Sequence, residues 1–453
     1  MDTNFTSDVK KGMNMSAMPL GPRHIFIVLV ASMGQFIGQG LATLVGIVIP
    51  LIQLAAHPEL SAARQGLLGC VSLIGIMFGT VAIGRLSDRY GYLTLFRICP
   101  LVIASASLLV IFVHSYPILV ASLFIMGFAI GGEYSLDPDY ISELMPDKWR
   151  TFMVGFAKAL ASAGSAVVAV ICYFMIMNSG KPEIWPDMFV ITAIAGLLMF
   201  ISRIPFARSP QWLADHGRDN EAEEAVRKFL GKNVYMDIKP SPAPATRSQN
   251  LWTFIKNNLR DVILTGVPWA CEGLGVYGIG IFLPVLIMSF KIDSLPASAP
   301  AIEHITHSVG LTLALSVVMV IGFAGGLMIM RRFNHLRQQI IGFLGCVVGL
   351  GILLAAYILH WPSWIAITGF VIFELALNAG PHLITFILPS QVFPVDDRGT
   401  GAGIAAGIGK AGAVIGAFII PVMLHTGGPV LVLIVTIAVM ALGALITLLT
   451  AKK

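Results

Sequence analysis

Residues 84–97 read GRLSDRYGYLTLFR, a short polar segment between two long apolar runs. Gly84 and Gly91 permit a tight reversal of the chain and a close approach of two helices. The charged side chains of the segment can pair with one another or with a neighbouring helix end. They include Asp88, Arg89 and Arg97. The segment therefore predicts a charged turn that joins two apolar helices.

The runs on either side of this turn belong to a chain that is far more apolar than a soluble domain. Of its 453 residues, 56% are hydrophobic and 12% are charged, and such proportions are typical of a protein embedded in a bilayer. The hydrocarbon core requires about 20 apolar residues per helix. Twelve such runs begin near residues 24, 66, 95, 117, 152, 188, 261, 307, 338, 363, 400 and 428. We therefore predict an all-α membrane protein with twelve transmembrane helices.

A polar stretch divides the twelve runs into six and six. It spans residues 208–260 and contains the sequence AEEAVRKFLG, which predicts a short amphipathic helix. We expect an N-terminal six-helix bundle over residues 1–207, a cytoplasmic linker over 208–260 and a C-terminal six-helix bundle over 261–453. When both termini and the linker lie on one side of the membrane, most of the 29 Lys and Arg residues lie there too. The positive-inside rule then predicts that both termini are cytoplasmic.

The two halves share a spacing motif. Glu143-Leu-Met-Pro-Asp-Lys-Trp-Arg150 follows the fourth run, and Gln391-Val-Phe-Pro-Val-Asp-Asp-Arg398 follows the tenth. Both segments have Glx, Pro and Arg at the same intervals, which indicates an internal duplication and two pseudo-symmetric bundles. Repeats of this kind generally place a substrate site near the bilayer midplane, between two halves that move against each other.

Several stretches resemble known families. Residues 84–97 resemble the loop signature of the major facilitator superfamily. Residues 131–143, GGEYSLDPDYISE, resemble the fourth-span pattern of phosphate:proton symporters, and the overlapping YISELMP is equally close to sugar porters. Residues 380–394 and 398–413 are similar to the phosphate-symporter pattern around spans ten and eleven. The resemblance covers nearly the whole chain and implies the major facilitator fold and a bacterial metabolite:proton symporter near the phosphate and sugar branches.

The sequence also departs from the phosphate symporters. Their first-span acid has no counterpart between Met33 and Gly40, and their fourth-span arginine is replaced by apolar residues around Leu123. His382 stands in place of an asparagine. The substrate therefore stays open among phosphate, a sugar acid, a carboxylate and a neutral sugar.

Ionisable residues inside the predicted spans are candidate functional groups, because a charge at the centre of a membrane helix costs at least about 2.5–3.5 kcal/mol. Five residues lie deep: Glu133, Lys158, Glu272, Glu374 and Lys410. A carboxylate can carry a proton when exclusion of water favours its neutral form and the approach of a cation or solvent favours its charged form. We predict that Glu133 and Glu272 couple transport to protons.

The family resemblance bears on both acids. Glu133 occupies the position of the fourth-span acid of the phosphate symporters. In their seventh-span pattern W-x3-D-x3-Y, Trp269 and Tyr277 match, but Gly273 stands at the position of the acid. Glu272 precedes that position by one residue, which is a rotation of about 100° in an α-helix.

The candidate substrate-binding residues combine one ammonium group with an imidazole and aromatic rings. They are Lys410, His382, Tyr277, Trp269 and Tyr134. Lys410 matches a lysine of the symporter pattern, and its ammonium group can draw an anionic group into a cavity. The neighbouring Gly407, Gly409 and Gly412 would allow helices to pack closely around it.

Structural roles are the alternatives for several of these residues. Glu133 could be permanently paired, and Glu272 could form a salt bridge to Lys158 or to a polar neighbour. Lys158 could instead extend to the inner membrane interface, as long basic side chains do near helix ends. His382 could be a hydrogen-bonded structural histidine.

Charged and glycine residues of the predicted cytoplasmic turns form a candidate gating latch. Its members are Gly84, Asp88, Arg89, Gly91, Glu143, Arg150 and Arg398. Ion pairs in such a latch would close the inner mouth in one state and open in the other.

Other classes of function are excluded by missing motifs. The chain has no P-loop, nucleophile elbow or HExxH motif. Its five cysteines all lie within apolar runs, which argues against a disulfide framework or a metal site. The net charge of +5 is too small and too dispersed for a nucleic-acid surface. We expect neither an enzyme nor a cofactor, metal or nucleic-acid partner.

The sequence thus predicts a monomeric secondary transporter of the cell inner membrane. We expect proton-coupled symport of a small polar, anionic metabolite by alternating access. Two alternatives are a proton-coupled efflux antiporter and a transporter-like nutrient sensor that binds without net flux.

Overall fold

The fold was analysed in a computed structural model, which describes residues 13–55, 60–231, 233–236, 251–292, 295–296, 298–330, 332–393 and 398–451. The side chains of residues 88–90, 139, 151, 251, 390, 398 and 399 also lie outside the described part.

The first six membrane-spanning elements form the N-terminal half. Their bounds are α1 Pro22–Ala55, α2 Ala62–Tyr90, α3 Tyr92–Phe112, α4 Tyr116–Leu144, α5 Arg150–Ser179 and α6 Val190–Arg203. Two short 3₁₀ turns, η1 Pro182–Ile184 and η2 Asp187–Phe189, lead into α6. Gly91, with φ of 81°, ends α2 and begins α3, so the predicted tight reversal lies at a backbone conformation that favours glycine.

The helices of the C-terminal half are interrupted more often than those of the N-terminal half. Its elements are α10 Leu259–Gly273, the π-helical turn η3 Leu274–Ile279, α11 Leu283–Ser289, α12 Ala301–Met330, α13 His335–Ile358, α14 Ser363–Ala379, α15 Pro381–Ile387, α16 Pro389–Val392 and α17 Arg398–Thr450. The breaks in spans seven and ten coincide with η3 and with Gly380-Pro381. Interrupted helices free backbone groups at membrane depth and often lie at binding sites.

The prediction of twelve spans is confirmed once α17 is divided. In the described part of the chain, eleven helical segments are long and apolar enough to cross a membrane. The last of them, α17, has 53 residues, and at about 1.5 Å per residue it is far longer than a hydrocarbon core of about 30 Å. Gly428, with φ of 67° and ψ of −170°, interrupts the helical backbone within it. The chain therefore continues as two spans across this glycine.

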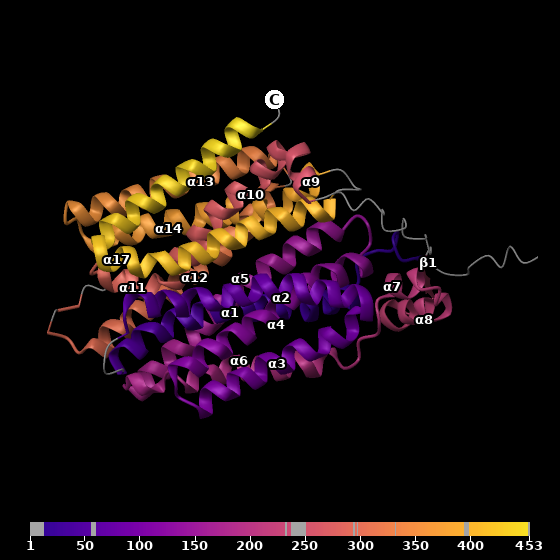
Figure 1. Cartoon of the computed structure of the whole chain (residues 1–453), viewed down its shortest axis with the longest axis horizontal. Helices are drawn as coiled ribbons and strands as arrows, with labels where there is room; N and C mark the ends of the chain where they lie inside the picture. The colour runs from indigo at the N-terminus through magenta and orange to yellow at the C-terminus, as the bar shows by residue number, and fades with distance from the viewer. Residues whose placement is uncertain are drawn as a thin grey trace, which may run out of the picture.

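The linker elements are α7 Pro210–Asp215, α8 Asp219–Leu230 and α9 Leu251–Asn257. In Figure 1, α7 and α8 pack together at the right-hand end of the molecule, and α9 lies beside α10 at the same end of the C-terminal half. The predicted amphipathic helix is α8, whose buried residues Ala222, Ala225, Val226 and Leu230 form one face. The two-residue strands β1 (Met13–Asn14) and β2 (Val234–Tyr235) pair in parallel.

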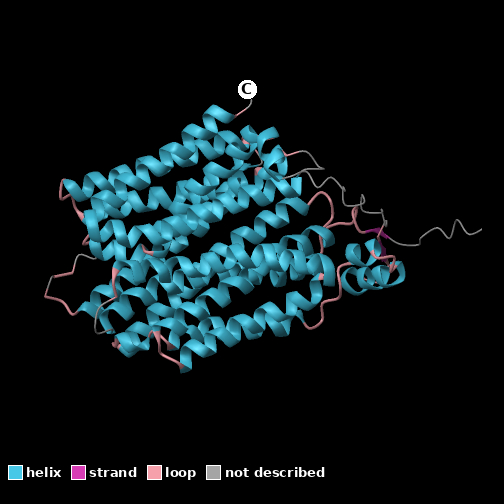
Figure 2. Cartoon of the chain, viewed as in Figure 1, coloured by secondary structure: helices cyan, strands magenta, loops and turns pink. Residues whose placement is uncertain are grey.

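The two halves lie side by side. Figure 1 shows the indigo and magenta N-terminal helices below the orange and yellow C-terminal ones, and Figure 2 shows that helices make up nearly all of the described chain. Across the boundary, α5 packs against α12 and α2 against α17. A binding site between the halves is therefore lined by both bundles.

The halves are in close contact at the end away from the linker. A Cβ built on Gly46 of α1 would lie 1.9 Å from the carbonyl oxygen of Ile281, and one on Gly66 of α2 would lie 2.5 Å from the carbonyl oxygen of Phe418. No side chain larger than hydrogen fits at either point without moving backbone. The halves therefore pack directly against each other at these two points.

Close packing also surrounds the segment that carries Lys410. A Cβ on Gly412 would lie 2.3 Å from the carbonyl oxygen of Ala270, whereas a Cβ on Gly403 of the same helix would meet nothing within 4 Å. We expect Gly412→Ala to destabilise the protein by about 1–3 kcal/mol, because the extra methyl group must separate α10 from α17. The measurement is the melting temperature of the purified protein in detergent. Gly403→Ala is the control, and an equal melting temperature for both variants would contradict this packing.

Candidate functional site

A central cavity of about 490 Å³ lies between the two halves. Its ionisable and aromatic lining residues are Arg85, Tyr134, Lys158, Trp269, Glu272, Tyr277, His382, Phe386 and Lys410. All five predicted substrate-binding residues are among them, together with Glu272 of the predicted proton-coupling pair. The cavity reaches Arg85 near the end of α2 and Gly403 near the start of α17, so it extends toward the end of the molecule where the linker lies.

Lys410 projects between two phenol rings. Its Nζ lies 4.9 Å from the ring centroid of Tyr134 and 4.8 Å from that of Tyr277, and it donates a hydrogen bond of 3.3 Å to Tyr277 Oη. Gly409, next to Lys410, lets the Trp269 ring lie directly against α17, since a Cβ there would be 2.6 Å from the ring. The aromatic rings thus hold the ammonium group at the cavity wall.

Lys158 brings a second ammonium group into the cavity. Its side chain is 7% exposed, and its Nζ lies 5.3 Å from the ring centroid of Tyr134 and 5.6 Å from that of Phe386. The lysine lines the cavity instead of extending to the membrane interface. Among the described residues, neither Lys158 nor Lys410 has a carboxylate within 4 Å.

Glu272 pairs with His382 in the same cavity. The distance from His382 Nδ1 to Glu272 Oε1 is 2.7 Å, and both residues are at most 5% exposed. The alternative partner Lys158 is not the one observed. The rotation of one residue in the seventh span is explained by Gly273, because a Cβ there would lie 2.7 Å from the carbonyl oxygen of Gly409. An acid at 273 would face α17, whereas Glu272 faces the cavity.

The charges that line the cavity do not balance. Arg85, Lys158 and Lys410 contribute three basic side chains, and Glu272 is the one carboxylate among the lining residues. Cations in a water-poor cavity attract anions more strongly than they would in bulk water, since the surroundings screen them less. The arrangement is therefore suited to an anionic ligand.

Glu133 lies outside this cavity. Its neighbour Tyr134 lines the cavity, whereas Glu133 is fully buried within the N-terminal half, and its Oε2 lies 2.7 Å from Nη1 of Arg203. Asp137, one turn further along α4, places Oδ1 3.4 Å from Nη2 of the same guanidinium group. The alternative of a paired Glu133 thus matches the observed contact.

Asp137 and Arg203 were missed by sequence reasoning. Arg203 is the last residue of α6, and its place at the end of an apolar run does not indicate burial. The structure buries it completely, with its guanidinium 3.5 Å from the ring centroid of Phe96. The available signal was the spacing of Glu133 and Asp137 by four residues, which places both on one face of a helix.

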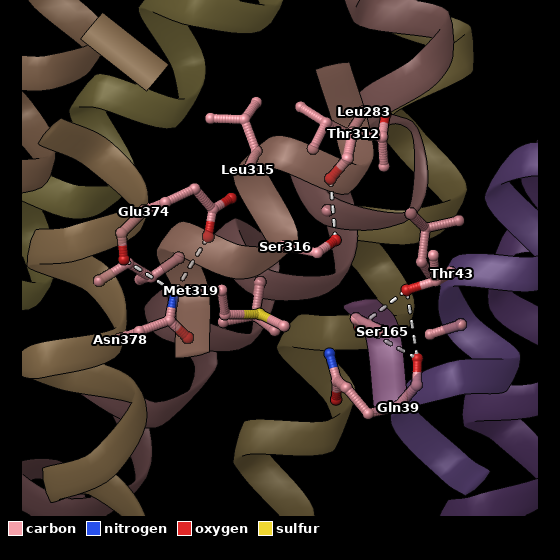
Figure 3. Close-up of a pocket in the computed structure, with 15 residues that line it drawn as sticks. Gln39, Thr43, Ser165, Leu283, Thr312, Leu315, Ser316, Met319, Glu374 and Asn378 are labelled. Carbon is pink, nitrogen blue, oxygen red and sulfur yellow. Dashed lines mark hydrogen bonds between the residues drawn. The ribbon is translucent and has the colours of Figure 1, made fainter. Parts of the chain in front are cut away.

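A second, smaller pocket of about 40 Å³ also lies between the two halves and shares no lining residue with the central cavity. Figure 3 shows hydroxyl and amide groups that converge on it from both halves. Thr43 donates a 2.8 Å hydrogen bond to Ser165 on the N-terminal side, and Asn378 Nδ2 donates a 2.9 Å hydrogen bond to Glu374 Oε2 on the C-terminal side. Val276 lines this pocket, whereas the next residue, Tyr277, lines the central cavity. Glu374 lines the smaller pocket and not the central cavity.

Asn378 presents an acceptor to this pocket. Its Nδ2 also donates to the carbonyl oxygen of Glu374 at 2.8 Å, which fixes the orientation of the amide because both partners are acceptors. Asn378 Oδ1 has no donor among the described residues and is almost fully buried. Thr312 and Ser316 of α12 also line the pocket, which is thus built for hydroxyl groups or water.

The predicted gating latch is only partly described. The side chains of Asp88, Arg89 and Arg398 lie outside the described residues. Arg150 pairs with Asp147 at 2.8 Å, and Glu143 accepts a hydrogen bond from Ser209. The latch stays a prediction.

Two more of the motif residues have clear positions. Arg97 donates to the carbonyl oxygens of Ile204 and Phe206 at 2.6 and 2.9 Å, and so binds the end of α6. Gly84 lies beside α4, where a Cβ would be 3.4 Å from Ser135 Oγ.

Comparison with solved structures gives the class of the fold. The chain superimposes on the partially occluded, inward-open xylose transporter XylE of Escherichia coli with a TM-score of 0.75 and 22% identity, over 94% of this chain and 97% of that one. Another match, with a TM-score of 0.73, is the proton:xylose symporter XylE with a bound bromodeoxyglucose, which is a member of the major facilitator superfamily. The fold is therefore the major facilitator fold, as predicted.

Sequence comparison gives the family. The Sugar (and other) transporter family matches residues 2–453, and the chain belongs to it. It is therefore a multi-pass membrane transporter and not an enzyme. The inner membrane metabolite transport protein YgcS of Escherichia coli K12 is 25% identical over 404 residues, 89% of this chain and 86% of that protein. The D-xylose-proton symporter of the same organism is 27% identical over 416 residues, 84% of this chain and 81% of that protein.

Proposed function

We propose that the protein is a proton-coupled symporter that carries a small, anionic metabolite across the inner membrane, with both termini in the cytoplasm. The observation that supports the anionic substrate is the excess of cations around the central cavity, where Arg85, Lys158 and Lys410 face a single carboxylate. Proton coupling is supported by the buried acids and by the D-xylose-proton symporter among the relatives.

The central cavity and the smaller pocket together suggest a substrate with two kinds of group. An anionic group would bind Lys158 and Lys410 in the central cavity, and hydroxyl groups would bind Glu374, Asn378 and their neighbours in the smaller pocket. A hydroxylated organic acid, such as a sugar acid, has both. The relatives include proteins named for D-xylose, niacin and phosphate, a range of small polar solutes.

Alternating access would open the substrate site to one side of the membrane and then to the other. In this conformation the halves touch at Gly46 and Gly66, away from the linker, while the central cavity extends toward the linker end. Glu272 would exchange its partner His382 for a proton as the substrate anion enters or leaves. The predicted latch residues would close the linker end in the opposite state.

A ligand screen by thermal shift tests the substrate class. We expect hydroxylated monocarboxylates to raise the melting temperature of the purified transporter. At a ligand concentration of 100 times the dissociation constant, binding adds about 2.7 kcal/mol to the free energy of unfolding. Neutral polyols of the same length should raise it less at equal concentration, because they lack the group that binds the two lysines. Equal shifts for the acids and the neutral polyols would contradict an anionic substrate.

A further inference from the structure

The N-terminal half contains a buried charge cluster that is separate from the substrate cavity. Glu133 and Asp137 on α4 and Arg203 at the end of α6 are all fully buried. The two carboxyl groups bind the two terminal nitrogens of one guanidinium group, at 2.7 and 3.4 Å. If both acids were ionised, the cluster would carry one uncompensated negative charge away from water.

Surrounding groups do not neutralise this charge. The titratable residues beside the cluster are Cys99 of α3 and Tyr140 of α4, and neither side chain can carry a positive charge. Arg97 of α3 donates to the carbonyl oxygens of residues 203, 204 and 206 and so faces the far side of the turn. On α1, Gly34 lies against Glu133, where a Cβ would be 2.4 Å from Glu133 Cβ, and the backbone of Gln35 lies beside Asp137. No second cation contacts the two carboxyl groups among the described residues.

The hydrogen bonds of the two acids also indicate that they hold one proton. Glu133 Oε1 and Asp137 Oδ2 are buried with no donor from another described residue. The two carboxyl groups contact the two terminal nitrogens of one guanidinium group, so they lie close to each other. Two carboxylates cannot hydrogen-bond each other, because each is an acceptor only, whereas a carboxylic acid can donate to a carboxylate. One proton would satisfy the oxygens and balance the charge of Arg203.

We propose that Glu133 and Asp137 form a carboxyl pair that shares a single proton, with Arg203 as its fixed counterion. The proton site is then a pair and not Glu133 alone, and Asp137 is an equal member of it. Like charges this close cannot both ionise without a large penalty, so the pair takes up and releases one proton as a unit.

The placement of the pair explains how it could respond to transport, a step that rests on the proposed proton-coupled symport. Tyr134 lies in the central cavity beside Lys158 and Lys410, and the preceding residue, Glu133, belongs to the pair. A movement of α4 as substrate binds would shift Glu133 against Gly34 and Arg203. Water could then reach the pair only when α1 separates from α4.

Infrared difference spectroscopy of the reconstituted protein, between mildly acidic and mildly alkaline pH, tests the shared proton. We expect the wild type to show the stretching band of one protonated carboxyl group that is absent from both Glu133→Gln and Asp137→Asn. Either amide variant leaves one carboxylate for one guanidinium, so the remaining acid stays ionised. The double variant should lose no more of the band intensity than each single variant does. Glu221→Gln, on the linker helix α8, is the control and should keep the band.

A band that persists in Asp137→Asn and disappears only in Glu133→Gln would overturn the pair, as would a wild type without any band that depends on these residues. Melting temperatures establish that each variant is folded, and either single variant suffices if the other is not. The measurement needs no substrate. Proton-independent transport together with an intact band would refute the proposed function and leave the pair standing.

Discussion

Replacing both Lys158 and Lys410 with methionine is expected to weaken binding of an anionic substrate by about 100-fold or more. Hydrogen bonds to charged groups contribute about 1.5–3 kcal/mol each, and the two ammonium groups have no carboxylate partner within 4 Å among the described residues. Methionine keeps the length and the apolar stem of lysine. The variant should therefore fold and lose only the charge that binds the anion.

The affinity is measured for the acid that stabilises the wild type most in the thermal-shift screen. Each single variant should bind the acid at least about tenfold more weakly, which corresponds to about 1.4 kcal/mol of binding free energy. Lys256→Met, on the linker helix α9, removes a lysine far from the cavity and is the matched control. Unchanged affinity in the double variant would exclude these lysines from substrate binding.

Replacing Glu272 with glutamine is expected to abolish uphill accumulation while exchange of substrate across the membrane continues. Glutamine can still hydrogen-bond His382, which pairs with Glu272 at 2.7 Å, but it cannot bind or release a proton. Transport would then no longer draw on the pH gradient, and the internal concentration would rise only to the external one. The measurement is uptake into proteoliposomes with and without an imposed pH gradient.

Glu221→Gln is the control for this experiment. Glu221 lies on the linker helix α8 and pairs with Arg218 at 2.6 Å. This hydrogen bond lowers the pKa of Glu221, so the residue stays ionised throughout the assay. Accumulation against a gradient in Glu272→Gln would show that coupling depends on another group.

The helices could be predicted from the sequence because each apolar run is long enough to cross the bilayer. Run length does not determine where a span breaks, so the π-helical turn at residues 274–279 was not expected. The last two spans were predicted separately, and the structure joins them in one helical element across Gly428. A glycine at positive φ changes direction there without a loop.

The candidate site was predictable where a residue type is unusual for its surroundings. Lys410, Tyr277 and Trp269 follow a family pattern, and the structure places them around one cavity. Glu272 fell one residue off that pattern. Its orientation became clear only from the contact between Gly273 and α17, a contact between segments far apart in sequence.

The buried cluster could not be derived in the same way. Glu133 was identified, but Arg203 lies at the end of α6, where arginine commonly marks the membrane interface. Its burial depends on how α6 packs against α3, since its Nη1 also donates to the carbonyl oxygen of Phe96. The four-residue spacing of Glu133 and Asp137 is visible in the sequence, but their pairing with Arg203 is set by tertiary packing.

Proton movement during substrate uptake is the most direct test of proton-coupled symport. Proteoliposomes with a trapped pH-sensitive dye and no initial pH gradient receive the best acid from the thermal-shift screen. We predict that the interior acidifies as the substrate enters, and that vesicles with Glu272→Gln show no such change. Substrate entry without any change in internal pH in the wild type would contradict the account.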